Sequence, residues 1–154
     1  PLMERVGHAF IKRRMADENA LFAGEVTGHY YFRDFFFADS GIVPSLIVLE
    51  MLSRRKARLS DLLRPLEEKY FISGEINSTV ADPAGRIRAL AERYADAEQS
   101  FLDGISVIYP DWHFNVRPSN TEPLLRLNLE AKTRAEMERR RDEVLAIIRA
   151  ADAA

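Results

Sequence analysis

The sequence predicts an α/β segment followed by a small α+β domain with an antiparallel sheet and helices packed on one face of that sheet. In the segment 1–65, short aromatic-rich stretches and helical patterns lead into a long apolar helix. In the segment 66–154, the order of patterns is strand, helix, three strands and helix. The polar and basic stretch 54–60 is typical of a solvated helix end or a linker, so we expect the domain boundary shortly after it.

The first segment is expected to open with a helix and a short strand. Apolar residues recur near helical spacing between Val6 and Met15. A short strand at 21–23 then leads into the glycine-bounded stretch 24–29. The stretch 30–37 is rich in aromatic residues, which predicts a second strand or a packed loop.

Two helices close the first segment. Asp39 or Ser40 can cap a helix that extends to about Arg55, and this helix is apolar on nearly all sides between Ile42 and Leu52. A helix of this kind is usually buried, so we expect other elements of a layered domain to cover it. A shorter helix is expected from Ser60 to about Pro65.

The second segment has the pattern of a sheet covered by helices. A loosely alternating strand runs from Phe71 to Val80, and Asp82 and Pro83 have the residue types of an N-cap and a first helical position. That helix is expected to pack through Ile87, Leu90, Ala91 and Tyr94. Three strands are expected at 105–109, 112–116 and 124–131. A final helix from about Arg134 to Ala150 is expected to pack through Met137, Val144, Leu145 and Ile148.

The composition excludes several classes of function. The formal net charge of -2 gives no concentrated basic surface, so nucleic acid is not an expected partner. The longest apolar run, 42–52, is too short to span a bilayer, so no membrane association is expected. The chain has no cysteine, which excludes disulfides and thiolate metal sites and agrees with a cytoplasmic location. The three histidines lack metal-ligand spacing, so no metal site is predicted in this chain.

The stretch Arg117–Pro123 has the residue types of an anion-binding loop. It places a cation, two hydroxyls and an amide side chain in a turn between two predicted strands. The planar guanidinium of Arg117 matches phosphate oxygens, and Ser119, Asn120 and Thr121 can add further donors. An ordinary hairpin loop has a similar composition, so the residues alone leave both interpretations open.

The stretch Gly24–His29 has residue types suited to sugar hydroxyls. Glu25, Thr27 and His29 stand at alternate positions around two glycines. A carboxylate can accept two hydroxyl hydrogens, and glycine lets the backbone approach a ligand closely. A glycine-bounded turn with an incidental acid fits the same six residues.

Both stretches resemble loops of the α-D-phosphohexomutase family, of the phosphomannomutase/phosphoglucomutase type. Arg-Pro-Ser-Asn-Thr-Glu-Pro at 117–123, followed by an apolar strand that ends in Glu130-Ala131, is similar to the phosphate-binding loop of the family's last domain. Gly-Glu-Val-Thr-Gly-His at 24–29 resembles the family's sugar-recognition loop, with Thr27 in place of the more usual serine. The resemblance implies the end of the third mutase domain in residues 1–65 and the complete fourth domain in residues 66–154.

The resemblance implies roles for individual residues. The phosphate that is not transferred is expected to be bound by Arg117, Ser119, Asn120 and Thr121. Glu25 and Thr27 are expected to contact the sugar hydroxyls, with His29 nearby. His8, in the pair Gly7-His8, is expected to face the reacting phosphate and to assist proton transfer, whereas His113 is given a structural role.

Some family members also carry a basic residue on the strand that follows the phosphate loop. In this sequence that position is Asn128, and Arg126 lies two residues earlier. No additional cationic contact from this strand is therefore expected.

The resemblance also implies a reaction. Family members interconvert the 1- and 6-phosphates of hexoses through a phosphoserine and a bisphosphorylated intermediate, with Mg²⁺ at the transferring phosphoryl group. The family's phosphoserine motif and its acidic Mg²⁺ loop do not occur in this sequence. The implied partners are hexose phosphates and upstream mutase domains, the Mg²⁺ ligands are expected outside this chain, and the chain by itself is expected to be inactive.

Three other readings stay open. A phosphoglucosamine mutase is the nearest alternative enzyme, but those proteins usually have glycine at the position of Asn120 and glutamine at that of Val26. A noncatalytic phosphosugar-binding module and a structural domain with degenerate loops are the other two. Mannose and glucose phosphates are both candidate substrates, because no residue here is a clear reader of the C2 hydroxyl.

Overall fold

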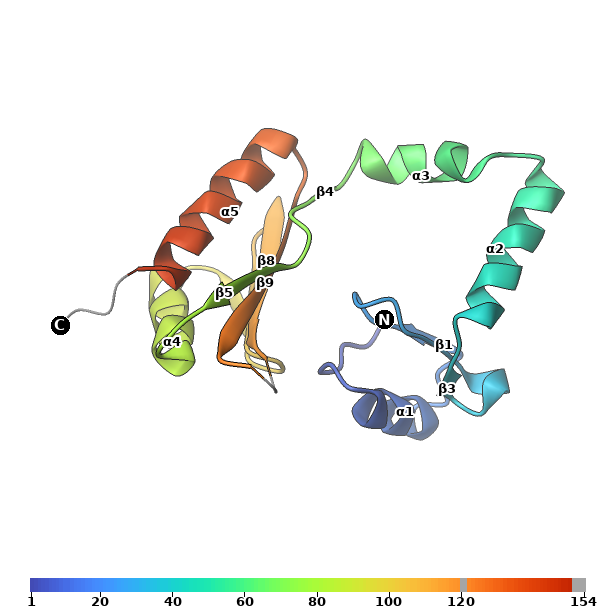
Figure 1. The fold of residues 1–154 in the computed structure, drawn as a ribbon, viewed down its shortest axis with the longest axis horizontal. Coiled ribbons are helices and arrows are strands. Elements are labelled where there is room, and N and C mark those ends of the chain that lie inside the picture. The colour runs from blue at the N-terminus through green and yellow to red at the C-terminus, as the bar shows by residue number, and fades with distance from the viewer. Residues whose placement is uncertain (120–121, 151–154) are drawn as a thin grey trace. The chain divides into compact units, whose positions relative to one another are not determined.

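A computed structural model of the chain describes residues 1–119 and 122–150 (Figure 1). It contains two compact units, Pro1–Leu63 and Arg64–Ala154. The division falls two residues before the boundary expected from the sequence. The fold class is confirmed: an α/β segment precedes an α+β domain with an antiparallel sheet.

The first unit begins with a helix packed on a small sheet. Its elements are α1 (His8–Asp17), β1 (Phe22–Gly24), β2 (Tyr30–Phe32), the 3₁₀ turn η1 (Arg33–Phe35) and β3 (Ala38–Asp39). The three strands are antiparallel in the order β1-β2-β3. Ile11 and Met15 of α1 are buried against Tyr31 of β2, which is the largest side chain of this small core. The strand predicted in the stretch 30–37 is therefore present, but it ends after three residues.

The next helix, α2 (Ile42–Arg55), is followed by α3 (Leu59–Glu67). The Ser40 hydroxyl accepts a hydrogen bond from the backbone N–H of Val43 at 3.2 Å, as expected of a residue at a helix start. The apolar side chains of α2 differ from the prediction, because no residue of this helix is buried. Ile42 and Leu46, for example, are 73% and 60% exposed. No other element among the described residues supplies the expected cover on both sides of α2.

The second unit is a six-stranded antiparallel sheet with two helices. Its elements are β4 (Phe71–Ile72), β5 (Ile76–Thr79), α4 (Pro83–Arg93), β6 (Glu98–Ser100), β7 (Ile105–Ile108), β8 (Trp112–Pro118), β9 (Leu124–Ala131) and α5 (Arg134–Ile148). The strand order is β4-β9-β8-β7-β6, and β5 also pairs with β9. The sequence did not predict β6, because this short strand is polar and has no apolar alternation.

Helices α4 and α5 lie on the same side of this sheet (Figure 1). Side chains alternate strictly between buried and partly exposed along β9, so that Leu125, Leu127 and Leu129 face the helices. Leu90 of α4 and Val144 of α5 are fully buried in the same core. The other face of the sheet carries polar side chains, and this is the face that matters for the candidate site.

Both helices have side-chain caps. The Asp82 carboxylate accepts from the N–H of Gly85 at 2.9 Å, which confirms the predicted N-cap of α4. The Thr133 hydroxyl accepts from the N–H of Glu136 at 3.2 Å at the start of α5. Each cap satisfies a backbone donor that the helix cannot pair internally.

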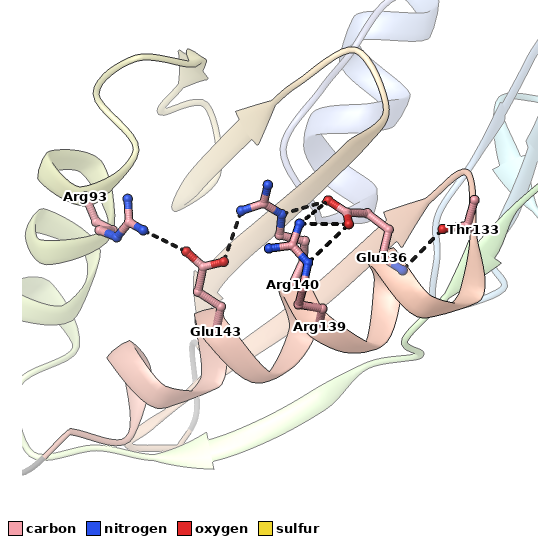
Figure 2. Close-up of polar contacts among 6 residues, drawn as sticks. All are labelled: Arg93, Thr133, Glu136, Arg139, Arg140 and Glu143. Carbon is pink, nitrogen blue, oxygen red and sulfur yellow. Dashed lines mark hydrogen bonds and ion pairs between the residues drawn. The ribbon is translucent and has the colours of Figure 1, made fainter.

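An ion-pair network runs along α5 and reaches α4. Figure 2 shows its members, which are Arg93, Glu136, Arg139, Arg140 and Glu143, together with the cap residue Thr133. The Glu143 carboxylate accepts from Arg140 at 3.0 Å and from Arg93 of α4 at 2.9 Å. Hydrogen bonds from Arg139 and then Arg140 lower the pKa of the Glu136 carboxyl. The contact between Arg93 and Glu143 joins α4 to α5, although each surface pair of this kind contributes little to stability.

Candidate functional site

The stretch Gly24–His29 forms the turn of the hairpin that joins β1 to β2. The N–H of Glu25 donates to the carbonyl of His29 at 2.9 Å, and the N–H of Gly28 donates back to the carbonyl of Glu25 at 3.0 Å. Gly28 has a φ of 87°, a conformation that favours glycine. Val26 is 85% exposed in this turn. The turn therefore presents its side chains to solvent on a hydrogen-bonded backbone.

The Glu25 carboxylate is oriented by two hydroxyl donors. The Tyr31 hydroxyl donates to one of its oxygens, and the Thr27 hydroxyl donates to the other at 3.2 Å. Burial, and then the hydrogen bond to Glu25, raise the pKa of Tyr31 well above its ordinary value, so this hydroxyl stays protonated. The remaining lone pairs of Glu25 can accept further hydroxyl hydrogens, as recognition of vicinal sugar hydroxyls requires.

His29 and Asp39 form the second polar contact of this hairpin. The His29 Nδ1 lies 3.1 Å from an Asp39 carboxylate oxygen, between the turn and β3. The hydrogen bond from His29 is the main cause that lowers the pKa of the Asp39 carboxyl. Glu25, Thr27 and His29 therefore lie together on one hairpin, where Thr27 bonds to Glu25 and His29 to Asp39.

We expect this contact to be visible as a titration. In the folded protein the Asp39 carboxyl should titrate below its ordinary value of 3.8, and His29→Ala should return its pKa toward that value. Because the folded pKa is depressed, the stabilisation is present above the unfolded-state pKa and is lost as the pH falls through the folded one. Carboxyl ¹³C shifts measure this directly. His113→Ala is the control, and an unchanged Asp39 titration in His29→Ala would contradict the assignment.

His8 is the first residue of α1 and is exposed. Helix α1 packs on the sheet through Ile11 and Met15, so His8 and the Gly24–His29 turn belong to the same unit. Within the described chain, no hydrogen bond joins His8 to that turn. Its expected role in proton transfer stays a prediction.

Arg117 lies near the end of β8, where the chain enters the predicted anion loop. Its side chain is 12% exposed, and its guanidinium donates to a Glu75 carboxylate oxygen at 3.3 Å. The N–H of Ser119 donates to the carbonyl of Leu124 at 2.9 Å and closes the hairpin between β8 and β9. Asn120 and Thr121, the other two expected phosphate ligands, lie outside the described residues.

Arg126 of β9 lies directly opposite Arg117 in the strand register. Its guanidinium donates to the second oxygen of the same Glu75 carboxylate at 3.1 Å. We call Arg117 and Arg126 the arginine pair. Neither Glu75 nor Arg126 was expected in the site. One signal in the sequence could have indicated Arg126, namely the register of the β8–β9 hairpin. Each arginine stands next to a buried apolar residue on its strand, so both belong to the polar face of the hairpin.

Gly104 supports the strand that carries Arg117. It has a φ of 70°, and a Cβ at this position would collide with the Val116 carbonyl oxygen and lie 2.6 Å from the Arg117 Cα. The loop before β7 therefore packs its bare backbone directly against the residue that carries the guanidinium.

Two further properties concern metals and membranes. Across residues 1–119 and 122–150, no three histidine, aspartate or glutamate side chains gather in an arrangement that could hold a metal ion. Among the same residues, every helix is too short or too polar to cross a membrane.

Comparison with known proteins places both units in one family. The family model for phosphoglucomutase/phosphomannomutase, alpha/beta/alpha domain III, matches residues 1–70. The model for the C-terminal domain of phosphoglucomutase/phosphomannomutase matches residues 75–147. Together these two matches include the Gly24–His29 turn and both members of the arginine pair.

Individual relatives agree with these matches. A phosphomannomutase of Salmonella typhimurium is 44% identical over 86% of this chain and 29% of its own length. A phosphomannomutase of Methanocaldococcus jannaschii is 39% identical over 99% of this chain and 34% of its own length. A crystal structure of a phosphoglucomutase/phosphomannomutase family protein from Burkholderia thailandensis superposes with a TM-score of 0.78 at 32% identity, over 99% of this chain and 34% of that one. The chain thus spans about a third of the length of its relatives, and it belongs to the phosphoglucomutase/phosphomannomutase family.

Proposed function

We propose that this chain is the C-terminal part of a cytoplasmic phosphohexomutase that interconverts the 1- and 6-phosphates of mannose and glucose. In this proposal, residues 1–65 are the end of the third mutase domain and recognise the sugar, while residues 66–154 are the fourth domain and bind phosphate. The family matches and the share of its relatives' length that the chain spans support this assignment. The observation that carries it is the Arg117 guanidinium, which lies beside the predicted loop and already binds a carboxylate.

Different residues recognise different parts of the substrate. Glu25 accepts hydrogen bonds from two sugar hydroxyls, in an orientation set by Tyr31 and Thr27. His29 lies beside them and contacts the substrate. The phosphate that is not transferred is bound by Arg117, Ser119, Asn120 and Thr121. His8 moves a proton at the reacting phosphate.

This division suits a substrate that must bind in two orientations. Each reaction cycle includes one phosphoryl transfer at each end of the sugar. The phosphate at one end is therefore held while the phosphoryl group at the other end is transferred. A guanidinium binds phosphate by charge and by its planar donors, whichever carbon the phosphate is attached to. A carboxylate that reads two neighbouring hydroxyls tolerates the same reversal. Holding the substrate in this way supplies positioning, on which phosphoryl transfer largely depends.

The groups that move phosphate are proposed to lie upstream of this chain. Neither the phosphoserine motif nor the acidic metal loop of the family occurs in the sequence. The described residues offer no metal-binding cluster, so the residues present do not fit Mg²⁺. In the intact enzyme Mg²⁺ would stabilise negative charge on the transferring phosphoryl group.

The test compares two proteins and one variant. We expect the full-length enzyme to interconvert mannose 1-phosphate and mannose 6-phosphate, and the 154-residue chain to show no turnover. Glu25→Gln in the full-length enzyme should lower kcat/KM about 10- to 100-fold, because hydrogen bonds to a charged acceptor contribute about 1.5–3 kcal/mol. Glu138→Gln on α5 is the matched control. Turnover by the isolated chain, or a Glu25→Gln enzyme as active as the control, would contradict the proposal.

A further inference from the structure

The hydrogen bond between His29 and Asp39 joins a proposed substrate contact to a residue that the proposed function leaves without a role. The His29 Nδ1 lies 3.1 Å from an Asp39 carboxylate oxygen. The hairpin turn holds the backbone of His29, whose carbonyl accepts from the N–H of Glu25 at 2.9 Å. Asp39 is held by β3, where it lies directly opposite the buried Tyr31 of β2. The sheet therefore fixes the backbone at both ends of this contact.

His29, Tyr31 and Asp39 lie on the same side of the small sheet, the side on which α1 packs. Positions 29 and 31 are two residues apart, so their side chains point to the same face, and directly opposite residues such as Tyr31 and Asp39 also share a face. Tyr31 packs against α1 in the core of the first unit. The hydrogen bond from His29 is the largest cause that lowers the pKa of the Asp39 carboxyl, and the charge of Lys12 on α1 adds to it.

The charge of Asp39 decides which ring nitrogen of His29 carries the proton. Because its pKa lies below the ordinary value of 3.8, Asp39 is a carboxylate at neutral pH. A carboxylate can only accept hydrogen bonds, so the contact requires a proton on the His29 Nδ1. A neutral imidazole has one donor and one acceptor nitrogen, and the lone pair is therefore on Nε2.

The same contact determines where the Nε2 lone pair points. The imidazole ring is planar and rigid, so holding Nδ1 at Asp39 directs Nε2 away from that carboxylate. The His29 side chain is 56% exposed, and the neighbouring Glu25 also offers acceptors to hydroxyl groups. We propose that Asp39 is a positioning residue, which keeps the proton of His29 on Nδ1 and so presents the Nε2 lone pair to the hydrogen of a sugar hydroxyl. This inference rests on the proposed function, in which His29 contacts the substrate, and extends it to the atom that makes the contact.

The first test locates the proton by ¹⁵N NMR of the imidazole rings at alkaline pH, where imidazole is neutral. The 154-residue chain has three histidines, so the His29 ring is assigned by its loss in His29→Ala. We expect the proton on Nδ1 in the unchanged chain. In Asp39→Asn it should move largely to Nε2, the position that a free histidine side chain prefers, because an amide can donate to Nδ1 as well as accept from it. A proton on Nε2 in the unchanged chain would overturn the proposal.

The second test measures the effect on turnover of glucose 1-phosphate by the full-length enzyme. We expect Asp39→Asn to lower kcat/KM about tenfold, because His29 then carries its proton on the correct nitrogen for only part of the time. Asp34→Asn removes the same charge from an exposed residue of the same unit and should leave kcat/KM unchanged. Since Asp39 acts through His29, adding Asp39→Asn to His29→Ala should cause no further loss.

The outcomes separate this inference from the proposed function. If His29→Ala is impaired while Asp39→Asn matches the Asp34→Asn control, Asp39 does not position His29 and the proposed function stands. Losses that add in the double variant also contradict the inference. If His29→Ala is fully active, both the inference and the substrate contact proposed for His29 are wrong. Circular dichroism checks the fold, and if Asp39→Asn is unfolded, the position of the proton in the unchanged chain decides.

Discussion

Replacing Arg117 with alanine in the full-length enzyme is expected to lower kcat/KM for hexose phosphates by about two to three orders of magnitude. The Arg117 side chain is only 12% exposed, so its hydrogen bonds to an anion form in a site from which much of the water is excluded. The truncation also leaves Glu75 paired with Arg126 alone, and one guanidinium neutralised by one carboxylate has little attraction left for phosphate. Both effects weaken substrate binding in either orientation.

Steady-state kinetics with mannose 1-phosphate measure this loss. Arg117→Lys should be intermediate, because lysine keeps the charge and loses the planar donors. Arg139→Ala is the matched control, since Arg139 is exposed and pairs within α5. A folded Arg117→Ala enzyme with full activity would favour the reading in which the loops are degenerate and the domain is structural.

The Phe114→Ala variant is expected to destabilise the second unit by about 3–5 kcal/mol. Phe114 is fully buried in the centre of β8. Its ring lies 5.3 Å from that of Tyr94, beyond the end of α4, and 5.8 Å from that of Trp112. Truncation removes these contacts and leaves a cavity between the sheet and the helices. Since small domains are stable by only about 5–15 kcal/mol, this is a large fraction of the total.

Urea unfolding of the 154-residue chain measures this change. The chain has one tryptophan, Trp112, so its fluorescence reports specifically on the second unit. His113→Ala is the control at the neighbouring position, where the side chain is exposed, and it should change stability by less than about 0.5 kcal/mol. Equal unfolding midpoints for the two variants would show that Phe114 does not hold the sheet to the helices.

The fold could be predicted from sequence where one pattern continues without interruption. The strand predicted at 124–131 has the bounds found in the structure, because β9 alternates strictly between the core and the polar face. The stretch from Phe71 to Val80 alternates only loosely, and the structure gives the reason. A β-bulge at Gly74 reverses the alternation halfway, so a single expected strand is two short ones.

In each unit, candidate site residues could be proposed from the sequence where they are neighbours along the chain. The Gly24–His29 turn could be identified from six consecutive residues. Glu75 and Tyr31 could not be identified, because they reach the site through strand pairing and no local motif marks them. Arg126 stands in the right sequence window, yet its contact with Glu75 depends on the bulge in a strand about fifty residues away. The roles assigned to the site residues stay predictions, and Asn120 and Thr121 also lie outside the described residues.

The close approach of Gly104 to the backbone of Arg117 has a consequence for protein engineering. A designer who wished to move the proposed phosphate site to another scaffold would naturally transplant the hairpin loop alone. That transplant would leave behind the loop before β7, whose bare glycine leaves room for the end of β8. Any side chain on the recipient at that point would displace the Arg117 Cα by steric contact. The smallest transferable unit is therefore discontinuous and includes both the β8–β9 hairpin and the loop before β7, so grafting should be planned on these two segments together instead of on the motif.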